Sequence, residues 1–340
     1  MLMGLDIGGT KCAVVLGKTR SGSCQKDHIE ILDRSSFATP ATPDKALAQL
    51  LDAAAQLAAA YAHDEPLDAV GISCGGPLDS RRGLILSPPN LPRWDRVDVL
   101  TPINQRFGVP AALENDANAC ALAEWHWGAG RGCRNMVFLT FGTGMGAGLI
   151  LDGRLYRGTN DMAGEVGHIR LAPDGPIGYG KAGSFEGFCS GGGIANAAQS
   201  AAKGWLAAGH SSVLGAPADA VNCITAKDVA EAAQAGDALA LEILRSTALY
   251  LGRGLATLID ILNPERIVLG SIYVRQRALL QPLMMEELAR EALALSQSVC
   301  EIVPAGLGEA VGDYASLSVA ADAVARKKAA AAASLPSNGD

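Results

Sequence analysis

Residues 137–153, VFLTFGTGMGAGLILDG, place four glycines at alternate positions between two apolar runs. Gly142-x-Gly144-x-x-Ala147 matches the loose fingerprint of a dinucleotide-binding turn, in which a helix follows the glycines and its N-terminus binds the pyrophosphate. Here the glycines lead into a short apolar run that ends at Asp152-Gly153, a turn signal. The stretch therefore predicts a hairpin of two strands, and the Rossmann interpretation is weak.

The same design recurs near the start of the chain, at residues 2–17, LMGLDIGGTKCAVVLG. Gly8-Gly9-Thr10 occupies the position that Gly142-Thr143-Gly144 holds in the other copy. Glycines allow positive φ and let backbone N–H groups approach an anion. Two unrelated surface hairpins would also give this pattern, because glycine turns are common. The matched turns, with an acid and a lysine beside the first, favour two related domains whose turns bind phosphate across a cleft.

The composition excludes several classes of protein. A chain of 340 residues is long enough for two domains, and 49% hydrophobic with 19% charged residues is typical of a globular protein. The net charge of −7 argues against nucleic acids and anionic membranes as main partners. No apolar run reaches the roughly 18 residues of a membrane span, and no basic segment typical of a signal peptide precedes the first strand. The eight scattered cysteines, without a C-x-x-C pair, favour reduced thiols in the cytoplasm.

Apolar periodicity and turn signals predict alternating strands and helices, which indicates α/β layers. One helix should begin at Asn115 or Asp116, because these residue types are favoured as N-caps, and should end before Gly128. The other expected elements are helices at 43–61, about 237–262 and about 315–328, and strands at 68–73 and 266–270.

Asp6 interrupts an otherwise apolar strand just before Gly8-Gly9-Thr10-Lys11. A carboxylate at a strand end beside a phosphate loop is suited to holding Mg²⁺, because this ion prefers carboxylate and phosphate oxygens. A turn-capping aspartate is the alternative, and it would be the better interpretation of Asp6 alone. Its neighbours favour the metal-binding role.

Asp116 follows a strand-like run and precedes the expected helix. It could simply cap that helix. If it faces the cleft, it is a candidate general base for a substrate hydroxyl that attacks a γ-phosphate, since phosphoryl transfer needs positioning and charge neutralisation more than covalent chemistry.

Glu165, His168 and Glu186 lie in a glycine-dense stretch of some thirty residues. Carboxylates and imidazoles bind the adjacent hydroxyls of polyols, and a long glycine loop is usually functional or disordered. A solvated Glu165–His168 pair and a structural histidine are the alternatives.

Five motifs, in this order, resemble the ROK family of sugar kinases: LDIGGTK, LENDANACALAE, FGTGMGAGLILDG, AGEVGH and GSFEGFCSGGGI. The resemblance covers residues 2 to about 325 and implies an α/β fold of two ribonuclease-H-like (actin-like ATPase) domains with an interdomain cleft. It implies an N-terminal α/β domain at 1–115, joined by a C-terminal helix at about 313–328, and a larger C-terminal α/β domain at 116–312. Residues 329–340 are expected to form a disordered tail.

The resemblance also implies roles for individual residues. Asp116 looks like the family's catalytic base. Residues similar to the family's sugar contacts are Gly76, Asn90, Asn115, Asp116, Glu165, His168 and Glu186. Residues similar to its nucleotide and metal contacts are Asp6, Gly8, Gly9, Thr10, Lys11, Gly142, Thr143, Gly144, Gly270 and Ser271, with Ser271 in place of a usual glycine.

One departure concerns zinc. Many members have three cysteines before the glutamate that Glu186 matches, and a histidine completes their zinc site. The three cysteine positions are occupied here by Ile177, Tyr179 and Ser184, none of which is an ordinary zinc ligand. We therefore expect no structural zinc, and we expect the loop to be held by packing of Ile177, Tyr179, Phe185 and Phe188.

Together these observations predict a cytoplasmic hexose kinase that uses ATP and Mg²⁺, resembles glucokinases and phosphorylates the 6-hydroxyl of glucose or a related hexose. The family suggests a homodimer or homotetramer. Its repressors have a winged-helix domain before the kinase core, and since the core begins at residue 2 we expect no binding of nucleic acid. Two alternatives stay open: a non-catalytic sugar-binding sensor on the same fold, and an actin-like ATPase that acts on a partner.

Overall fold

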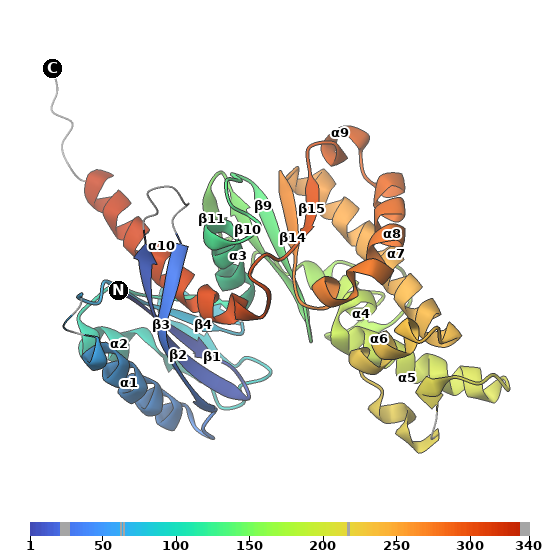
Figure 1. Cartoon of the computed structure of the whole chain (residues 1–340), viewed down its shortest axis with the longest axis horizontal. Helices are drawn as coiled ribbons and strands as arrows, with labels where there is room; N and C mark the ends of the chain where they lie inside the picture. Colours follow the sequence, from blue (N-terminus) through green and yellow to red (C-terminus); the bar gives the residue numbers. More distant parts are fainter. Residues whose placement is uncertain (21–27, 62, 64, 216–217, 334–340) are drawn as a thin grey trace.

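Two five-stranded sheets, one in each half of the chain, organise the computed structural model, which describes residues 1–20, 28–61, 63, 65–215 and 218–333 (Figure 1). The first sheet has the order β3-β2-β1-β4-β8 and the second the order β11-β10-β9-β14-β15. The strands of the first are β1 (Leu2–Ile7), β2 (Lys11–Arg20), β3 (His28–Ala38), β4 (Ala69–Cys74) and β8 (Ala111–Asn115). Those of the second are β9 (Met136–Phe141), β10 (Met145–Leu151), β11 (Arg154–Tyr156), β14 (Arg266–Leu269) and β15 (Glu301–Pro304).

The two sheets share one topology. In each, a glycine turn joins two antiparallel strands, β1 with β2 and β9 with β10. On its other edge the first strand of each hairpin pairs in parallel, β1 with β4 and β9 with β14. The residues after the second glycine turn form β10 and not a helix, so the Rossmann interpretation is excluded. The repeated topology confirms the α/β fold of two ribonuclease-H-like, actin-like domains.

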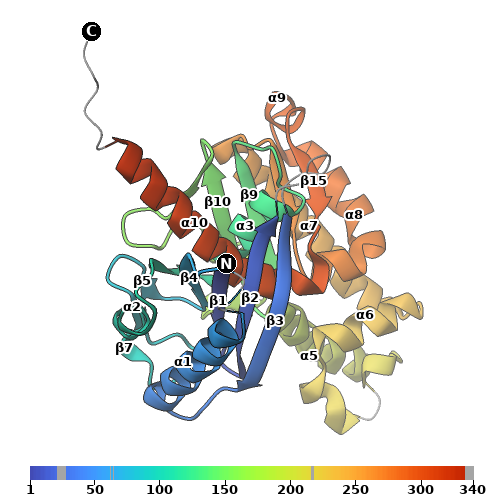
Figure 2. The same ribbon diagram turned by 60° about the vertical axis from the view of Figure 1, so that its left-hand side comes forward.

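Helices cover both sheets, most of them beside the second (Figures 1 and 2). They are α1 (Pro43–Ala60), α2 (Leu100–Phe107), α3 (Asp116–Trp127), α4 (Phe185–Cys189), α5 (Gly191–Ala207), α6 (Ala226–Gln234), α7 (Ala238–Leu262), α8 (Ile272–Glu291), α9 (Ala294–Gln297) and α10 (Val311–Ala333). Short strands complete the fold: β5 (Leu78–Asp79), β6 (Leu84–Leu86), β7 (Asp95–Asp98), β12 (Ile177–Gly178) and β13 (Lys181–Ala182).

Local signals explain the helix ends. α1 has proline at its first position, where a missing N–H costs nothing. α3 begins after Asn115, whose side chain accepts a hydrogen bond from the Asn118 backbone N–H at 2.7 Å, and it ends at Gly128, as expected. α7 ends at Leu262, and the next residue, Asn263, is its C-cap, with a left-handed backbone conformation at φ 45°.

α3 and α10 lie side by side between the two sheets (Figures 1 and 2). α10 packs on β1 and β4 of the first sheet, and α3 packs on β9 and β10 of the second. Glycines make both contacts close: a Cβ at Gly71 would stand 2.2 Å from the Ser316 carbonyl oxygen of α10, and one at Gly148 would stand 2.4 Å from the Ala121 Cβ of α3.

The chain passes from the first sheet to the second at the β8–α3 junction and returns between β15 and α10. Glu124, a fully buried residue of α3, contacts the return passage. Its carboxylate accepts hydrogen bonds from the backbone N–H groups of Ala129 at 2.7 Å and of Gly306 and Leu307 at 3.0 Å each. Backbone donors of this kind satisfy the hydrogen-bonding needs of a buried carboxylate.

The last helix differs from the expectation. α10 continues to Ala333, so residues 329–333 are helical and are not part of a disordered tail. The remainder of the expected tail, residues 334–340, lies outside the described residues. The alanine run explains the difference, because alanine has the highest helix propensity.

Two further features bear on composition. No helix within the described part of the chain is long and apolar enough to span a membrane. Seven cysteines in the described residues have free thiols, and Cys24 lies outside those residues.

Candidate active site

Asp116 lies at the junction of β8 and α3, where the first sheet meets the second half of the chain. Its Oδ1 accepts a hydrogen bond from the Ala117 backbone N–H at 2.8 Å. The side chain is open to solvent on one side, but the protein around it displaces water. This desolvation raises the pKa of Asp116, against the opposing effect of the backbone donors.

Asp6 reaches the same edge of the sheet from β1. In the parallel register, Asp6 pairs with Ser73 of β4 and Ser73 with Glu114 of β8, so the carboxyl ends of the three strands coincide. Burial, then the charges of Asp116 and Asp313, raise the pKa of Asp6 to about 6. A cation in front of this edge would stabilise both ionised carboxylates.

The donor set here fits a magnesium ion that arrives with a nucleotide. Among the described residues, no group of three His, Cys, Asp or Glu side chains could form an all-protein metal site. Mg²⁺ usually takes only one or two carboxylates and completes its shell with phosphate oxygens and water. Asp6 is therefore suited to hold the ion directly or through water.

The first glycine turn, Gly8 to Lys11, closes β1 and β2. The Gly8 N–H donates to the Lys11 carbonyl oxygen at 3.1 Å, and Thr39 Oγ1 donates to the Gly8 carbonyl oxygen at 2.6 Å. Gly9 has no room for a side chain, since a Cβ would stand 2.3 Å from the Asn90 carbonyl oxygen. Asn90, an expected sugar contact, thus lies against the first glycine turn.

The Asn90 side chain also borders the Gly75–Gly76 turn. Its Oδ1 is 3.4 Å from the position of a Cβ at Gly75. At Gly76 the corresponding space is open, so packing does not require glycine there.

The second turn, Gly142 to Gly144, is held by the N-terminus of α5. The Gly191 N–H donates to the Gly142 carbonyl oxygen at 2.7 Å, and the Gly192 N–H donates to the Thr143 carbonyl oxygen at 3.1 Å. Ser190 caps this helix by accepting from the Gly193 N–H at 3.0 Å. These bonds fix the turn while its outer side stays open.

A cavity of about 930 Å³ lies beside this turn, a size suited to a nucleotide. It is lined by Gly142, Thr143 and Ser271, all expected nucleotide contacts, and by residues that the sequence did not indicate. Those missed include Gly191, Gly192, Gln199, Lys227, Arg275 and Gln276. The only local sequence feature that could have indicated any of these lining residues is the glycine triplet 191–193, which follows Ser190.

Ser271 has an unusual backbone. Its φ of 47° and ψ of −109° belong to a region that glycine adopts easily and serine does not. Its Oγ lies 3.7 Å from the position of a Cβ at Gly142, so the hydroxyl borders the second turn. Gly270 packs beside the Phe138 ring.

Glu186 joins the expected sugar cluster to the second glycine turn. Its Oε2 accepts a hydrogen bond from the Met145 N–H at 3.1 Å and lies 3.2 Å from the position of a Cβ at Gly144. Ser184 caps α4, which contains Glu186, by accepting from the Gly187 N–H at 3.1 Å.

The pKa of Glu165 shows that the other members of the cluster lie nearby. Burial raises this pKa, the neighbouring His168 opposes the rise, and the charges of Asp116 and Glu186 add to it. Glu165 therefore lies near His168, Glu186 and Asp116.

The packing expected for the loop around His168 is half wrong. Phe185 and Phe188 are buried, and Phe188 stacks on Tyr250, but Ile177 is 57% and Tyr179 is 69% exposed. Tyr179 instead meets the His168 ring edge-on, with centroids 5.2 Å apart. β12 and β13 form a small hairpin on which these two residues face outward.

Comparison with known proteins agrees with this geometry. A family model described as the ROK family matches residues 2–322. A glucokinase of Halalkalibacterium halodurans is 34% identical over 274 residues, which cover 79% of each chain. The structure of a ROK family glucokinase from Streptomyces griseus in complex with glucose and AMPPNP aligns with a TM-score of 0.71 and 31% identity over 94% of this chain and 99% of that chain. A xylose repressor of Bacillus subtilis is 25% identical over 241 residues, 71% of this chain and 57% of the repressor.

Proposed function

The chain belongs to the ROK family and is a sugar kinase, and we propose that it transfers the γ-phosphate of ATP to the 6-hydroxyl of glucose or a related hexose. The contact between Glu186 and the second phosphate turn supports this proposal most directly. The short helix α4 would thus present the Glu186 carboxylate to a sugar hydroxyl, beside the Gly142–Gly144 turn, which would bind a phosphate. Such proximity is what direct transfer between the two ligands requires.

The sugar would lie between Asn90 and Asn115 on one side and Glu165, His168 and Glu186 on the other. Their amide, imidazole and carboxylate groups can donate to and accept from adjacent hydroxyls. The nucleotide would occupy the cavity beside Gly142, with its phosphates between the two glycine turns, and Lys11 is exposed at the first turn.

Asp116 would take the proton from the attacking hydroxyl as the general base. The sugar oxygen forms a bond to the γ-phosphorus, and the bond from that phosphorus to the β–γ bridging oxygen breaks, leaving its electron pair on ADP. A raised pKa suits the base, because it then accepts a proton more readily near neutral pH. Mg²⁺ supplies charge neutralisation on the phosphates when it is bound with ATP.

The decisive experiment measures ADP release from Mg·ATP across hexoses and N-acetylhexosamines, with a control that contains no sugar. Turnover that depends on one sugar supports the kinase and identifies its substrate. The cluster alone does not select among glucose, fructose, allose and the N-acetylated sugars, and glucose is proposed because relatives are glucokinases.

The same experiment separates the two alternatives. Hydrolysis that is independent of sugar favours an actin-like ATPase. Sugar binding without turnover favours a non-catalytic sensor, an alternative that the similarity to a xylose repressor keeps open. A homodimer or homotetramer in the cytoplasm remains a prediction, and light scattering on the purified protein measures the oligomeric state.

A further inference from the structure

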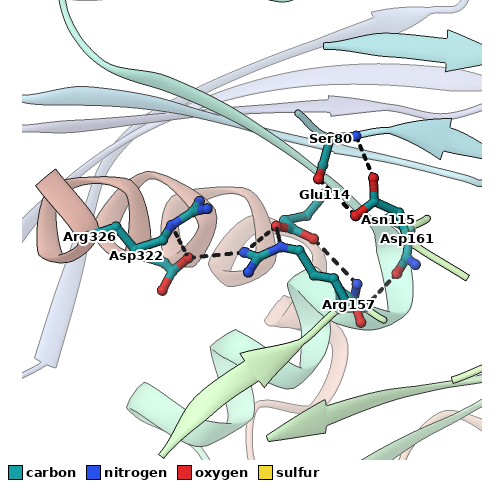
Figure 3. Close-up of polar contacts among 8 residues, drawn as sticks. Ser80, Glu114, Asn115, Arg157, Asp161, Asp322 and Arg326 are labelled. Carbon is teal, nitrogen blue, oxygen red and sulfur yellow. Dashed lines mark hydrogen bonds and ion pairs between the residues drawn. The ribbon is translucent and has the colours of Figure 1, made fainter. Parts of the chain in front are cut away.

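An ion-pair network joins the two halves of the molecule beside Glu114, two residues before Asp116 in the chain (Figure 3). Arg157 follows β11 of the second sheet, and it reaches Glu114 of β8 in the first sheet and Asp322 of α10. Its terminal nitrogen lies 3.3 Å from Asp322 Oδ2, and Arg326 pairs with the same carboxylate at 2.9 Å. Carboxylates from two separate elements, β8 and α10, thus converge on the Arg157 guanidinium.

Glu114 is the member of this network that lies closest in sequence to the site. It precedes Asn115 and Asp116 directly, and its side chain is 2% exposed. Burial raises its pKa, and the adjacent Arg157 opposes that rise. A carboxylate buried to this degree needs a cation or several donors to stay ionised, and Arg157 is the cation that contacts it.

Glu114 also reaches the first turn of α3. Its second oxygen accepts from Asn118 Nδ2 at 3.3 Å, and the Asn118 backbone N–H in turn donates to Asn115 Oδ1 at 2.7 Å. The pair Arg157–Glu114 therefore supports Asn118 in the first turn of the helix and, through Asn118, the cap residue Asn115 that precedes Asp116. Any shift of Glu114 moves the backbone to which the Asp116 carboxylate is attached.

The segment that begins at Arg157 makes a second contact with the first domain. Asp161 accepts hydrogen bonds from the Ser80 backbone N–H at 2.8 Å and from its hydroxyl at 2.9 Å (Figure 3). The same segment then leads to Gly164, whose carbonyl oxygen accepts from the Ala147 N–H at 2.7 Å, and to Glu165. One short stretch thus links β8, the Ser80 turn and the proposed sugar cluster.

We propose that Arg157 is a positioning residue, which holds Glu114 ionised and thereby fixes the Asp116 carboxylate for proton transfer across the two domains. This inference rests on the proposed function, in which Asp116 is the base. Arg157 touches neither the sugar nor ATP in this account, so its effect should fall on kcat and only weakly on either KM.

The test compares Arg157→Met with a control variant, Arg134→Met, and with a rescue variant in which Glu114 is also changed. Arg157→Met leaves Glu114 buried without its cation, and a misplacement of about 1 Å costs on the order of 100-fold in rate, so we expect kcat to fall by roughly 10- to 100-fold. Arg134→Met removes an arginine from an exposed pair, with Asp152 at 3.5 Å, and should leave kcat within about twofold of the native value because exposed pairs contribute little.

Rescue distinguishes positioning from a merely structural role. In the double variant Glu114→Gln/Arg157→Met the unpaired carboxylate is replaced by a neutral amide, so kcat should recover to within roughly tenfold of the native value. Hydrogen exchange at residues 113–119 should rise in Arg157→Met, fall again in the double variant and stay unchanged in Arg134→Met. If kcat in Arg157→Met stays within twofold of the native value, or if exchange at 113–119 does not change, the inference is wrong.

A native chain that phosphorylates no sugar would overturn the proposed function instead. The exchange measurements need no turnover, and they would still decide whether Arg157 fixes the backbone around Asp116.

Discussion

Asp6 at the end of β1 and Asp116 at the start of α3 share one edge of the first sheet, and burial, reinforced by the charge of Asp116, raises the pKa of Asp6 to about 6. When both carboxylates are ionised and no cation is bound, they repel each other. A magnesium ion bound beside them would offset this repulsion.

The raised pKa predicts a pH-dependent cost in stability. Since the folded pKa lies above the unfolded value of 3.8, the ionised form destabilises the fold, and this cost grows as pH rises from about 4 to about 6. Asp6→Asn should therefore raise the free energy of unfolding at pH 8, by at most about 3 kcal/mol, and leave it nearly unchanged below pH 4. Denaturant unfolding at both pH values measures the difference.

Exposed Asp152 offers the matched control, because Asp152→Asn at the surface should change the free energy of unfolding by no more than about 0.5 kcal/mol. Mg·ATP should stabilise the native chain more than Asp6→Asn. Equal stabilisation of the two proteins would exclude Asp6 from the metal site.

Asp116→Asn tests the proposed base. The amide keeps the shape of the side chain but cannot accept the proton, so kcat should fall by about 10²- to 10⁴-fold, while the dissociation constants of sugar and ATP change little. Initial rates and calorimetric titrations give the two quantities. Near-native turnover would remove Asp116 from the mechanism.

Ser271→Gly should stabilise the protein. Serine at φ 47° and ψ −109° is strained by roughly 1–3 kcal/mol, and glycine relieves most of this strain at a smaller cost in chain entropy. We expect a gain of about 1 kcal/mol in the free energy of unfolding. Ser271→Ala keeps the strained backbone without the hydroxyl, so it should show no gain. A KM for ATP that rises in both variants would assign the hydroxyl to nucleotide binding.

Tyr179→Ala should affect the sugar and not the fold. The exposed ring orients His168 by an edge contact, which is worth about 0.5–1.5 kcal/mol, so KM for the sugar should rise by roughly two- to tenfold with kcat and stability unchanged. Phe188→Ala is the contrasting variant: its buried ring should cost about 3–5 kcal/mol of stability. A loss of stability in Tyr179→Ala would show that the ring holds the loop together.

The absence of zinc stays a prediction with a direct test. Metal analysis of the purified chain should find well under one zinc per chain, and a zinc chelator should not lower turnover when Mg²⁺ is in excess. One zinc per chain would contradict the assignment of Ile177, Tyr179 and Ser184 to the three cysteine positions.

Elements with local signals were predictable from the sequence. Asn115 identified the start of α3, and the glycine turns identified both hairpins, because cap and turn chemistry act within a few residues. The duplicated topology followed from comparing the two hairpins. The last helix was underestimated, because the alanine run after Lys328 was interpreted as a tail although its propensity is helical.

Contacts between distant segments were not predictable in this way. The lining of the cavity beside Gly142 combines α5, α6 and α8, and residues such as Gln199 and Arg275 have no local feature that marks them. Ile177 and Tyr179 were assigned to packing because they are apolar, but hydrophobicity does not say that β12 and the turn after it place these side chains outward. The Arg157–Glu114 pair joins residues 43 positions apart and was equally invisible.

The two chain passages between the sheets have a mechanical consequence. The first passage is the start of α3, and Glu124, near the other end of that helix, binds the backbone of the loop that forms the second passage. Because both passages are held by α3, a rotation of one half of the molecule against the other about this helix would displace Asp116, at its start, less than residues far from the helix.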